Sequence, residues 1–388
     1  MMLQPRTIFL SVVVVVCLST EVQASNAADE CPLSCNCTEE VVDCRKAQFR
    51  SADGMLIIKR NSFPDLKTIY VSESSMGSLK GANMFGPGQR HPRLTDLSLV
   101  ETGITTIGEK TLEGAISLER LDLSYNDINA VHGDLFRDKL NLRYVNLTQA
   151  FDMGTTSTDE IARMVYKLFH NSHNTFRDLR QLILDDNDLT SLPRDAFCKL
   201  PALELLSLDD NDLDTFELAS GCLPRLRMLS LNGNEIKRVQ APQVVHWSAI
   251  FENMPLLEEV DLADNPFLCD CQLREFTEFV WKRRDLFVES SEDMRCSFAS
   301  DARFQDRRLL EVDADQLCTL ATEAPEGHAY MTMLLVMFMV AVLLGAYFYF
   351  RRHRWMVPSK SSKTTNNDYK VVGYRQLDTD DDVAPEFV

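Results

Sequence analysis

The fold is decided by Leu179-Arg-Gln-Leu182-Ile-Leu184-Asp-Asp-Asn187-Asp-Leu189 and by the next copy of the same pattern, Leu203-Glu-Leu-Leu206-Ser-Leu208-Asp-Asp-Asn211-Asp-Leu213. Alternate residues of a strand point to one face, so the leucines line one side of a short strand. One such unit cannot bury its apolar face alone and must stack on a neighbour. The asparagine can satisfy backbone groups where the chain leaves the strand.

The same pattern, Leu-x-x-Leu-x-Leu-x-x-Asn-x-Leu/Ile, recurs along the chain. Near-complete copies begin at Leu118, Leu226 and Leu257, and weaker ones begin at Leu66, Leu94 and Leu142. Repetition at this period predicts stacked parallel strands. We therefore expect an α/β fold, a leucine-rich repeat solenoid whose concave face is a parallel β-sheet.

Two loops are longer than the repeat requires, at 151–178 and 240–255. Long loops in a solenoid are usually functional or disordered. The first loop has apolar residues at helical spacing, which predicts a short amphipathic helix folded back on the convex side. These residues are Ile161, Met164, Val165, Leu168 and Phe169.

An apolar run at the start of the chain predicts secretion. Residues 1–24 carry one early positive charge at Arg6 and end in a small-residue cleavage pattern at Ala24, with Ala28 as the alternative cut. These features are typical of a signal peptide, whose apolar core is too short to cross a bilayer.

A second apolar run predicts a membrane anchor. Residues 329–350 contain no charged residue, and as a helix they would cross a hydrocarbon core of about 30 Å. Basic residues follow at 351–354, and positive charge beside such a helix stays in the cytoplasm. We expect a single-pass type I protein of the plasma membrane with its N-terminus outside.

Charge excludes a nucleic-acid binder. The 388 residues hold 58 acidic and 40 basic side chains, a net charge of -18, whereas phosphate binding needs clustered Lys and Arg. Residues 25–328 alone carry a net charge of -19. The simpler explanation of this negative charge is a solvated acidic face, and the alternative is a docking site for a basic partner.

Cysteines outside the signal segment are even in number, which in a secreted chain predicts disulfides. Cys198 and Cys222 lie 24 residues apart in adjacent repeats, at nearly equivalent positions within the reach of a disulfide. We predict a bridge between them, with two buried free thiols as the alternative. The other cysteines form clusters at 31–44 and 269–318, where zinc is disfavoured because neither cluster has a histidine at ligand spacing.

These two clusters resemble the N- and C-terminal caps of extracellular leucine-rich repeat proteins. The motifs are Cys31-Pro-x-x-Cys35-x-Cys37-x6-Cys44 and Asn265-Pro-Phe-Leu-Cys269-Asp-Cys271, the latter followed by Cys296 and Cys318. The resemblance implies the pairs Cys31–Cys37, Cys35–Cys44, Cys269–Cys296 and Cys271–Cys318. A solenoid needs such caps because its ends would otherwise expose the core.

The expected organisation follows. A signal peptide occupies 1–24, the N-terminal cap 25–60, and the repeats 61–265 with the insertion at 151–178. The C-terminal cap takes 266–320, a juxtamembrane linker 321–328, the transmembrane helix 329–350 and a cytoplasmic tail 351–388.

Side chains between the strand leucines are expected to face the concave surface, where a protein partner would bind. The candidates are Glu119, Arg120, Asp122, Arg143, Tyr144, Arg180, Gln181, Glu204, Arg227 and Met228. Two N-glycosylation sequons begin at Asn36 and Asn146. A glycan on Asn146 would cover the middle of this face and direct partners elsewhere.

No constellation of catalytic residues is visible, and we expect neither an enzyme nor a cofactor. His170 and His173 lie in the insertion without carboxylate support, so a solvated loop is favoured over a metal site. Residues 378–382 lack the alternation and the glycine of a calcium loop.

The tail is too short to form a signalling domain. Tyr374-Arg-Gln-Leu377 fits the Tyr-x-x-apolar endocytic pattern. The terminal Glu386-Phe387-Val388 could add a strand to a PDZ groove through its free carboxylate, so an intracellular PDZ scaffold is an expected partner.

The whole architecture resembles the trophoblast glycoprotein family, also called the Wnt-activated inhibitory factor family. The resemblance rests on both caps, the insertion that divides the repeats, and Leu192-Pro-Arg-Asp195 after it. It implies a cell-surface glycoprotein that inhibits Wnt/β-catenin signalling, with a Wnt pathway component as partner. The alternative is a cell-adhesion protein or a synaptic organiser.

Overall fold

The computed structural model describes residues 31–80, 83–171, 176–219, 221–237, 254–288, 290–319 and 326–353. The chain consists of two compact units, one within residues 1–322 and one within residues 323–388. The predicted signal peptide, the endocytic and PDZ motifs and His173 lie outside the described residues.

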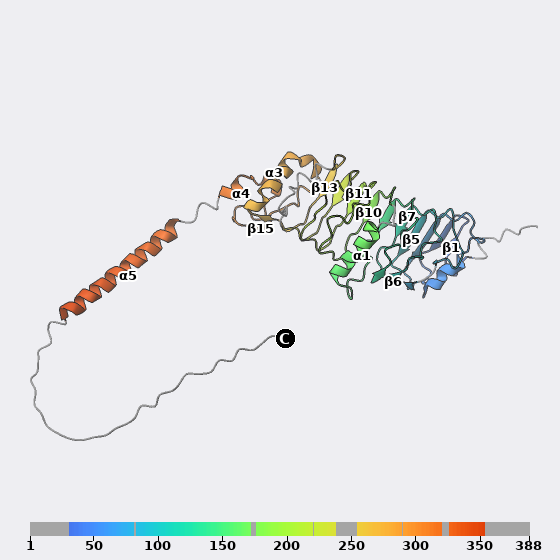
Figure 1. Cartoon of the computed structure of the whole chain (residues 1–388), viewed down its shortest axis with the longest axis horizontal. Coiled ribbons are helices and arrows are strands. Elements are labelled where there is room, and N and C mark those ends of the chain that lie inside the picture. Colours follow the sequence, from blue (N-terminus) through green and yellow to red (C-terminus); the bar gives the residue numbers. More distant parts are fainter. Residues whose placement is uncertain are drawn as a thin grey trace, which may run out of the picture. The chain divides into compact units, whose positions relative to one another are not determined.

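A ten-stranded sheet forms the first unit's main surface (Figure 1). Only the first pair, β1 with β2, is antiparallel; each later strand pairs in parallel with its neighbour. The parallel sheet predicted from the repeat is thereby confirmed. Its strands are β1 (Asn36–Cys37), β2 (Val41–Cys44), β3 (Thr68–Ser72), β5 (Asp96–Val100), β7 (Arg120–Asp122), β9 (Tyr144–Asn146), β10 (Gln181–Ile183), β11 (Leu205–Ser207), β12 (Met228–Ser230) and β13 (Glu259–Asp261).

Two smaller sheets lie outside this surface. Three short strands pair in the order β4, β6, β8, and two pair in the C-terminal cap. Short helices complete both caps. The bounds are β4 (Gly77–Leu79), β6 (Ile104–Ile107), β8 (Ala130–Val131), β14 (Leu268–Cys269), β15 (Phe298–Ala299), η1 (Ala52–Ile57), η2 (Cys271–Leu273), α3 (Arg274–Lys282), η3 (Arg284–Leu286), η4 (Leu309–Glu311) and α4 (Gln316–Thr319).

The repeat leucines form one continuous core. Leu179, Leu182, Leu184 and Leu189 each have none of their surface exposed. Burying such a side chain contributes about 1.5–3 kcal/mol. The core therefore depends on stacking, because the buried leucines of all the repeats belong to one hydrophobic cluster.

Buried asparagines join consecutive repeats. The Asn187 side-chain nitrogen donates to the carbonyls of Leu147, Leu184 and Asp185 at 2.8–3.0 Å, and its oxygen accepts from the Ala150 amide at 3.0 Å. Asn126, Asn211, Asn234 and Asn265 bond in the same way. The prediction that the asparagines satisfy backbone hydrogen-bonding groups is therefore confirmed. Asn187 does so on both sides of the insertion, because it bonds to Leu147 before it and to Leu184 after it.

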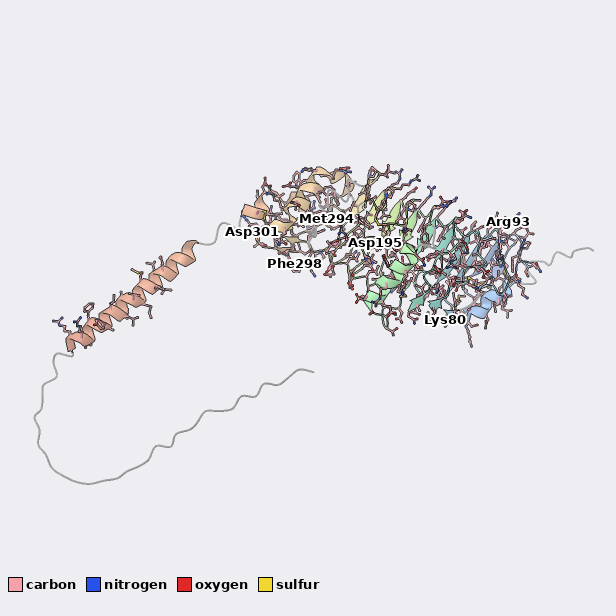
Figure 2. The ribbon with its side chains drawn as sticks, in the orientation of Figure 1. Lys80, Arg93, Asp195, Met294, Phe298 and Asp301 are labelled. Carbon is pink, nitrogen blue, oxygen red and sulfur yellow. A yellow bond between two sulfur atoms is a disulfide. The ribbon has the colours of Figure 1, made fainter. Side chains whose placement is uncertain are left out.

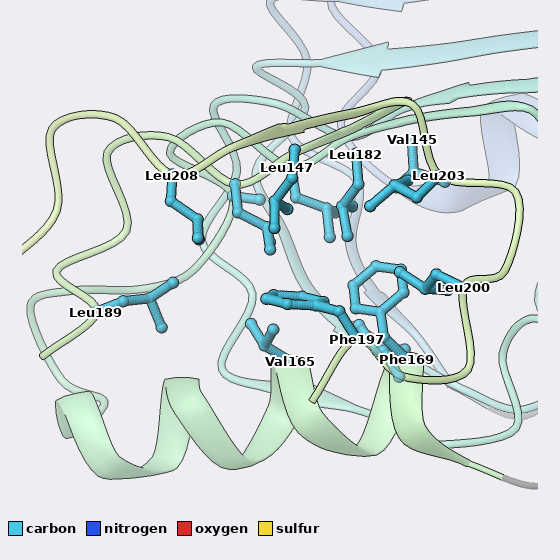
Figure 3. Packing of buried hydrophobic residues seen from close by; sticks show 14 of the residues in the cluster. Val145, Leu147, Val165, Phe169, Leu182, Leu189, Phe197, Leu200, Leu203 and Leu208 are labelled. Atoms are coloured by element: carbon cyan, nitrogen blue, oxygen red, sulfur yellow. The ribbon is translucent and has the colours of Figure 1, made fainter. Parts of the chain in front are cut away.

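The insertion contains the predicted helix, α1 (Thr158–His170), whose five apolar positions are all buried. Figure 3 shows α1 on the side of the core away from the strands, with Val165 and Phe169 directed inward toward Phe197. The ring centroids of Phe169 and Phe197 are 6.5 Å apart. The insertion thus adds to the core, so the helix predicted for the convex side is confirmed.

Five disulfides stabilise the first unit. They join Cys31 to Cys37, Cys35 to Cys44, Cys198 to Cys222, Cys269 to Cys296 and Cys271 to Cys318. These are the pairs that the sequence led us to expect, and four of the five lie in the terminal caps. Cys198–Cys222 instead connects the loops of neighbouring repeats.

The second unit contains one helix, α5 (Glu326–His353). Its side chains are described over 333–349 and 351–352, and all of these are exposed. The transmembrane helix was predicted at 329–350, inside these bounds. Within the described residues, no helix combines the length and the apolarity that crossing a membrane requires.

Candidate protein-binding surface

Exposed side chains of the ten-stranded sheet line up in rows, because neighbouring parallel strands are in register. We call this exposed face the concave face. Arg120 pairs with Tyr144, Tyr144 with Gln181, Gln181 with Leu205, and Leu205 with Met228. Four of these five residues were predicted to face the partner, and the register also brings Leu205 into the row.

The chemistry of this row, which we call the central row, changes along the sheet. It begins with the cation of Arg120, continues through the Tyr144 ring, and ends with the apolar Leu205 and Met228. Tyr144, Leu205 and Met228 are half-buried and Arg120 is exposed. Arg, Tyr and Met are enriched in protein interfaces, where aromatic and Arg side chains carry much of the binding energy.

Arg120 is held over its neighbour. Its guanidinium carbon lies 4.2 Å from the centroid of the Tyr144 ring, and its Nε lies 3.5 Å from a carboxylate oxygen of Asp96. Partial burial raises the pKa of Tyr144, and the carboxylate of Asp122 adds to the increase. The phenol therefore stays neutral at physiological pH and can donate a hydrogen bond to a partner.

A second row of alternating charges lies just before the strands. Arg143 binds Glu119 at 2.9 Å and Arg180 binds Glu204 at 3.2 Å, and Arg227 forms an ion pair with Glu258. Exposed pairs of this kind contribute about 0–1 kcal/mol to stability. Because both members of each pair are partly exposed, an incoming charged group can reach either of them.

Asn146 lies on β9 within this surface, as its sequon position predicts. Its Oδ1 accepts hydrogen bonds from the Thr148 amide at 3.0 Å and from the Thr148 hydroxyl at 2.7 Å. Neither bond uses the amide nitrogen to which an N-glycan attaches. Asn36, the other sequon residue, is exposed on β1 in the N-terminal cap, away from the central row.

Two carboxylates at the end of the strands were missed by sequence reasoning. Burial raises the pKa of Asp209 to about 6 and also raises the pKa of Asp185. Asp209 accepts from the Ser230 hydroxyl at 2.5 Å and from the Asn232 amide at 2.9 Å. The repeated Leu-Asp-Asp-Asn in both units was the available signal, although it could not reveal the burial.

The insertion histidine contacts a carboxylate that the sequence did not suggest. His170 Nε2 lies 3.5 Å from Asp195, and the Tyr166 hydroxyl donates to the same carboxylate at 3.3 Å. Figure 2 shows Asp195 beside α1. These contacts attach α1 to the following repeat. No three His, Cys, Asp or Glu side chains of the described ranges are arranged to hold a metal ion.

Parts of this chain are similar to known leucine-rich repeats. The leucine rich repeat family matches residues 92–149 and 177–236, which lie on either side of the insertion. Bovine Toll-like receptor 3 is 28% identical over 209 residues, a match that covers 52% of this chain and 21% of the receptor.

A longer similarity extends over most of the chain. Mouse trophoblast glycoprotein is 24% identical over 341 residues, covering 83% of this chain and 75% of that protein. The crystal structure of human trophoblast glycoprotein (5T4, Wnt-activated inhibitory factor 1) is similar with a TM-score of 0.60 and 22% identity, covering 75% of this chain and 99% of that one. These matches confirm the resemblance drawn from the caps and the insertion.

Proposed function

Because the chain has a leucine-rich repeat fold and is similar to trophoblast glycoprotein along most of its length, we propose that it is a cell-surface protein that binds extracellular partners and inhibits Wnt/β-catenin signalling. The observation that carries binding is the central row, where Arg120, Tyr144 and Met228 lie across neighbouring strands. The support for the Wnt role is the similarity to a protein that bears the name Wnt-activated inhibitory factor 1.

The membrane anchor in this proposal is α5. Residues 329–350 carry no charge, and the large apolar side chains from Met333 to Tyr349 remain 46–73% exposed. Lipid would cover such side chains at lower cost than water. The chain would then be a type I protein with the solenoid outside. Extraction of cell membranes with alkaline carbonate should leave the chain in the pellet, and its release would contradict the anchor.

Asn146 is the proposed glycan site that limits how partners approach. A glycan there would lie two residues along β9 from Tyr144, at one side of the central row, so a partner would have to contact Arg120 and Tyr144 from the other side of that row. An Asn146→Gln chain should lose one glycan, detected by peptide-N-glycosidase digestion, and should bind partners differently. Unchanged affinity and partner range would eliminate the shielding role.

The decisive test of function is a Wnt reporter assay. Cells that express the full chain should show a lower Wnt-stimulated signal than cells with empty vector. A matched chain with Arg120→Ala and Tyr144→Ala, brought to the same surface level, should lose most of that inhibition. A wild-type chain that leaves the signal unchanged would contradict the Wnt role.

Cell adhesion is the other outcome that the assay must separate. An adhesion protein would aggregate transfected cells with untransfected ones and would leave the reporter unaffected. The same two cell populations, mixed in suspension, provide this measurement. Aggregation without a reporter effect would replace the Wnt proposal.

The tail is proposed to bind intracellular adaptors. Val388 supplies the apolar carboxyl terminus that a PDZ groove accepts, and Tyr374 and Leu377 supply an endocytic signal. Added residues after Val388 should abolish binding to a PDZ scaffold, and Tyr374→Ala should slow internalisation. Scaffold binding that survives the extension would eliminate the PDZ role.

A further inference from the structure

One position of the repeat lies in the turn that leads into each strand. It is three residues before the first strand leucine, and its carbonyl accepts the amide hydrogen bond of that leucine, as Leu200 does from Leu203 at 3.2 Å. The position is normally large and apolar and faces the core. The residues that follow this rule are Phe63, Phe176, Leu200, Leu223 and Met254, each at most 3% exposed.

Three consecutive repeats break this rule. The same position holds His91, Ala115 and Lys139, in the turns before the adjacent strands β5, β7 and β9. His91 and Lys139 make the same turn hydrogen bond, each at 3.3 Å. A departure from a pattern that the rest of the chain keeps often marks a functional site, because it costs stability without helping the fold.

Lys139 is the most costly of these departures. Its side chain is only 6% exposed, and its ammonium forms no hydrogen bond or ion pair with any side chain in the part of the chain that the structure describes. Burial lowers its pKa. The ammonium is absent from the fully enclosed polar atoms that lack a partner, so it still reaches solvent. The carboxylates of Asp138 and Glu113 attract the ammonium but form no ion pair with it, so this buried cation remains destabilising unless something else binds it.

Lys139 is among the residues that line a pocket of about 370 Å³, which we call the Lys139 pocket. Two arginines in its wall are already paired, Arg90 with Glu113 at 3.7 Å and Arg137 with Glu109 at 3.0 Å. Arg137 also forms an ion pair with Asp134, which lies outside the wall. The remaining charges of the wall are those of Lys110, Lys139 and Asp138. The residues that line the pocket therefore carry four positive and three negative charges, an excess of one positive charge on a strongly acidic protein.

We propose that the Lys139 pocket binds the ring of an acidic sugar, with the Lys139 ammonium pairing with the sugar carboxylate. A single negative charge would neutralise the wall. The carboxylates of Glu109 and Glu113 keep free lone pairs after pairing with arginine and can accept hydrogen bonds from sugar hydroxyls. Site volumes for small molecules run from about 300 to 1,000 Å³, and a pocket at the lower end has room for one ring rather than a chain.

A long polyanion is a poorer fit than a single acidic ring. The net charge of -19 over residues 25–328 repels extended anionic chains, whereas a ring with one carboxylate meets mainly the local charge of the pocket. The carboxylate ring could come as a free sugar acid or as the end of a glycan, and the experiment separates these two sources.

The test uses the detergent-solubilised full chain and calorimetric titration with D-glucuronate, with D-glucose as the uncharged match. Glucuronate should bind at least about tenfold more tightly than glucose, because the charged hydrogen bond to Lys139 is lost with glucose. Lys139→Leu restores the residue found at position 200, so this variant should fold. It should lose the preference for glucuronate, and the exposed-surface control Lys199→Leu should keep it.

The outcomes are distinct. Equal binding of glucuronate and glucose, or an undiminished preference in Lys139→Leu, would overturn the proposal. A methyl glucuronide tests the source: if it binds as well as glucuronate, the pocket admits the glycosidic bond that a glycan end requires, and if only glucuronate binds, the ligand is a free sugar acid. The thermal midpoint of Lys139→Leu should equal or exceed that of the wild type, which shows that lost binding is not lost folding.

Discussion

The guanidinium of Arg120 lies 4.2 Å from the centre of the Tyr144 ring on the neighbouring strand, which fixes a cation and an aromatic face at the start of the central row. Exposed cation–π pairs stabilise a fold by only about 0.5–1 kcal/mol. We expect Arg120→Ala with Tyr144→Ala to lower the free energy of unfolding of the solenoid by about 1–2 kcal/mol, because the half-buried Tyr144 also loses apolar contacts. Urea unfolding of the solubilised full chain measures it.

A second cation–π pair provides the matched control. Arg284 lies 4.1 Å from the Trp281 ring in the C-terminal cap, outside the ten-stranded sheet. Trp281→Ala should have a similarly small effect on stability. A loss of several kcal/mol on changing Arg120 and Tyr144 would mean that the pair serves folding and is not reserved for a partner.

Asp209 should make the solenoid less stable as the pH rises. Its pKa of about 6 in the folded chain exceeds the usual value of about 3.9 for an unfolded chain, so the folded state binds more protons between these values. The contribution is complete below about pH 4 and is lost through about pH 6. Because the group is partly solvated, we expect about 1 kcal/mol, and Asp209→Asn should recover it at pH 7.4.

Asn at position 209 keeps the oxygen that accepts from Ser230 and Asn232 and removes only the charge. Asp210→Asn, at the exposed neighbouring position, is the control because it removes one carboxylate without changing Asp209 itself. Urea midpoints at pH 4.5 and pH 7.4 give the comparison. If the stability of Asp209→Asn depends on pH as that of the wild type does, the buried Asp209 carboxylate does not destabilise the folded chain as the structure implies.

Asn187→Ala should destabilise the solenoid by about 2–4 kcal/mol. The change removes one of two donors from each of the carbonyls of Leu147, Leu184 and Asp185. It also removes the side-chain acceptor of the Phe151 amide. Each lost hydrogen bond costs about 0.5–1.5 kcal/mol, and an unsatisfied buried group costs about 1–3 kcal/mol. The exposed Asn141→Ala is expected to stay within about 0.5 kcal/mol. Equal urea midpoints for the two variants would show that repeats are not joined through this side chain.

Loss of the Cys198–Cys222 bridge should cost about 2–4 kcal/mol, since it closes a loop of 24 residues and restricts the unfolded chain. Cys198→Ala with Cys222→Ala tests this by urea unfolding. Peptide mapping without reductant should find both cysteines in one linked fragment. Free thiol at Cys198 in the folded protein would contradict the bridge.

The parallel sheet, the helix of the insertion and the asparagine ladder could be predicted from sequence because each has a strong period or a fixed offset. The leucines of 179–189 define a strand face, and the spacing of Ile161, Val165 and Phe169 defines a helix face. The alignment of Arg120 with Tyr144 also follows, once the repeats are placed in register.

Other features depend on three-dimensional surroundings that no local pattern carries. The strands β4, β6 and β8 are two to four residues long and form only because successive loops stack. The high pKa of Asp209 results from burial, whereas the adjacent Asp210 has the same sequence context and is exposed. The unusual burial of Lys139 is recognised only when its turn is aligned with the turn that contains Leu200, because the equivalent position there is apolar.

Cell-surface proximity labelling tests the central claim most directly, namely that the concave face binds a protein partner. The labelling enzyme would be fused to the N-terminus of the mature full chain, in wild-type form and with Arg120→Ala and Tyr144→Ala, at equal surface levels. We predict a set of extracellular proteins that is labelled by the wild type and by Trp281→Ala and is lost with the double variant. An identical set for all three chains would contradict binding through this face.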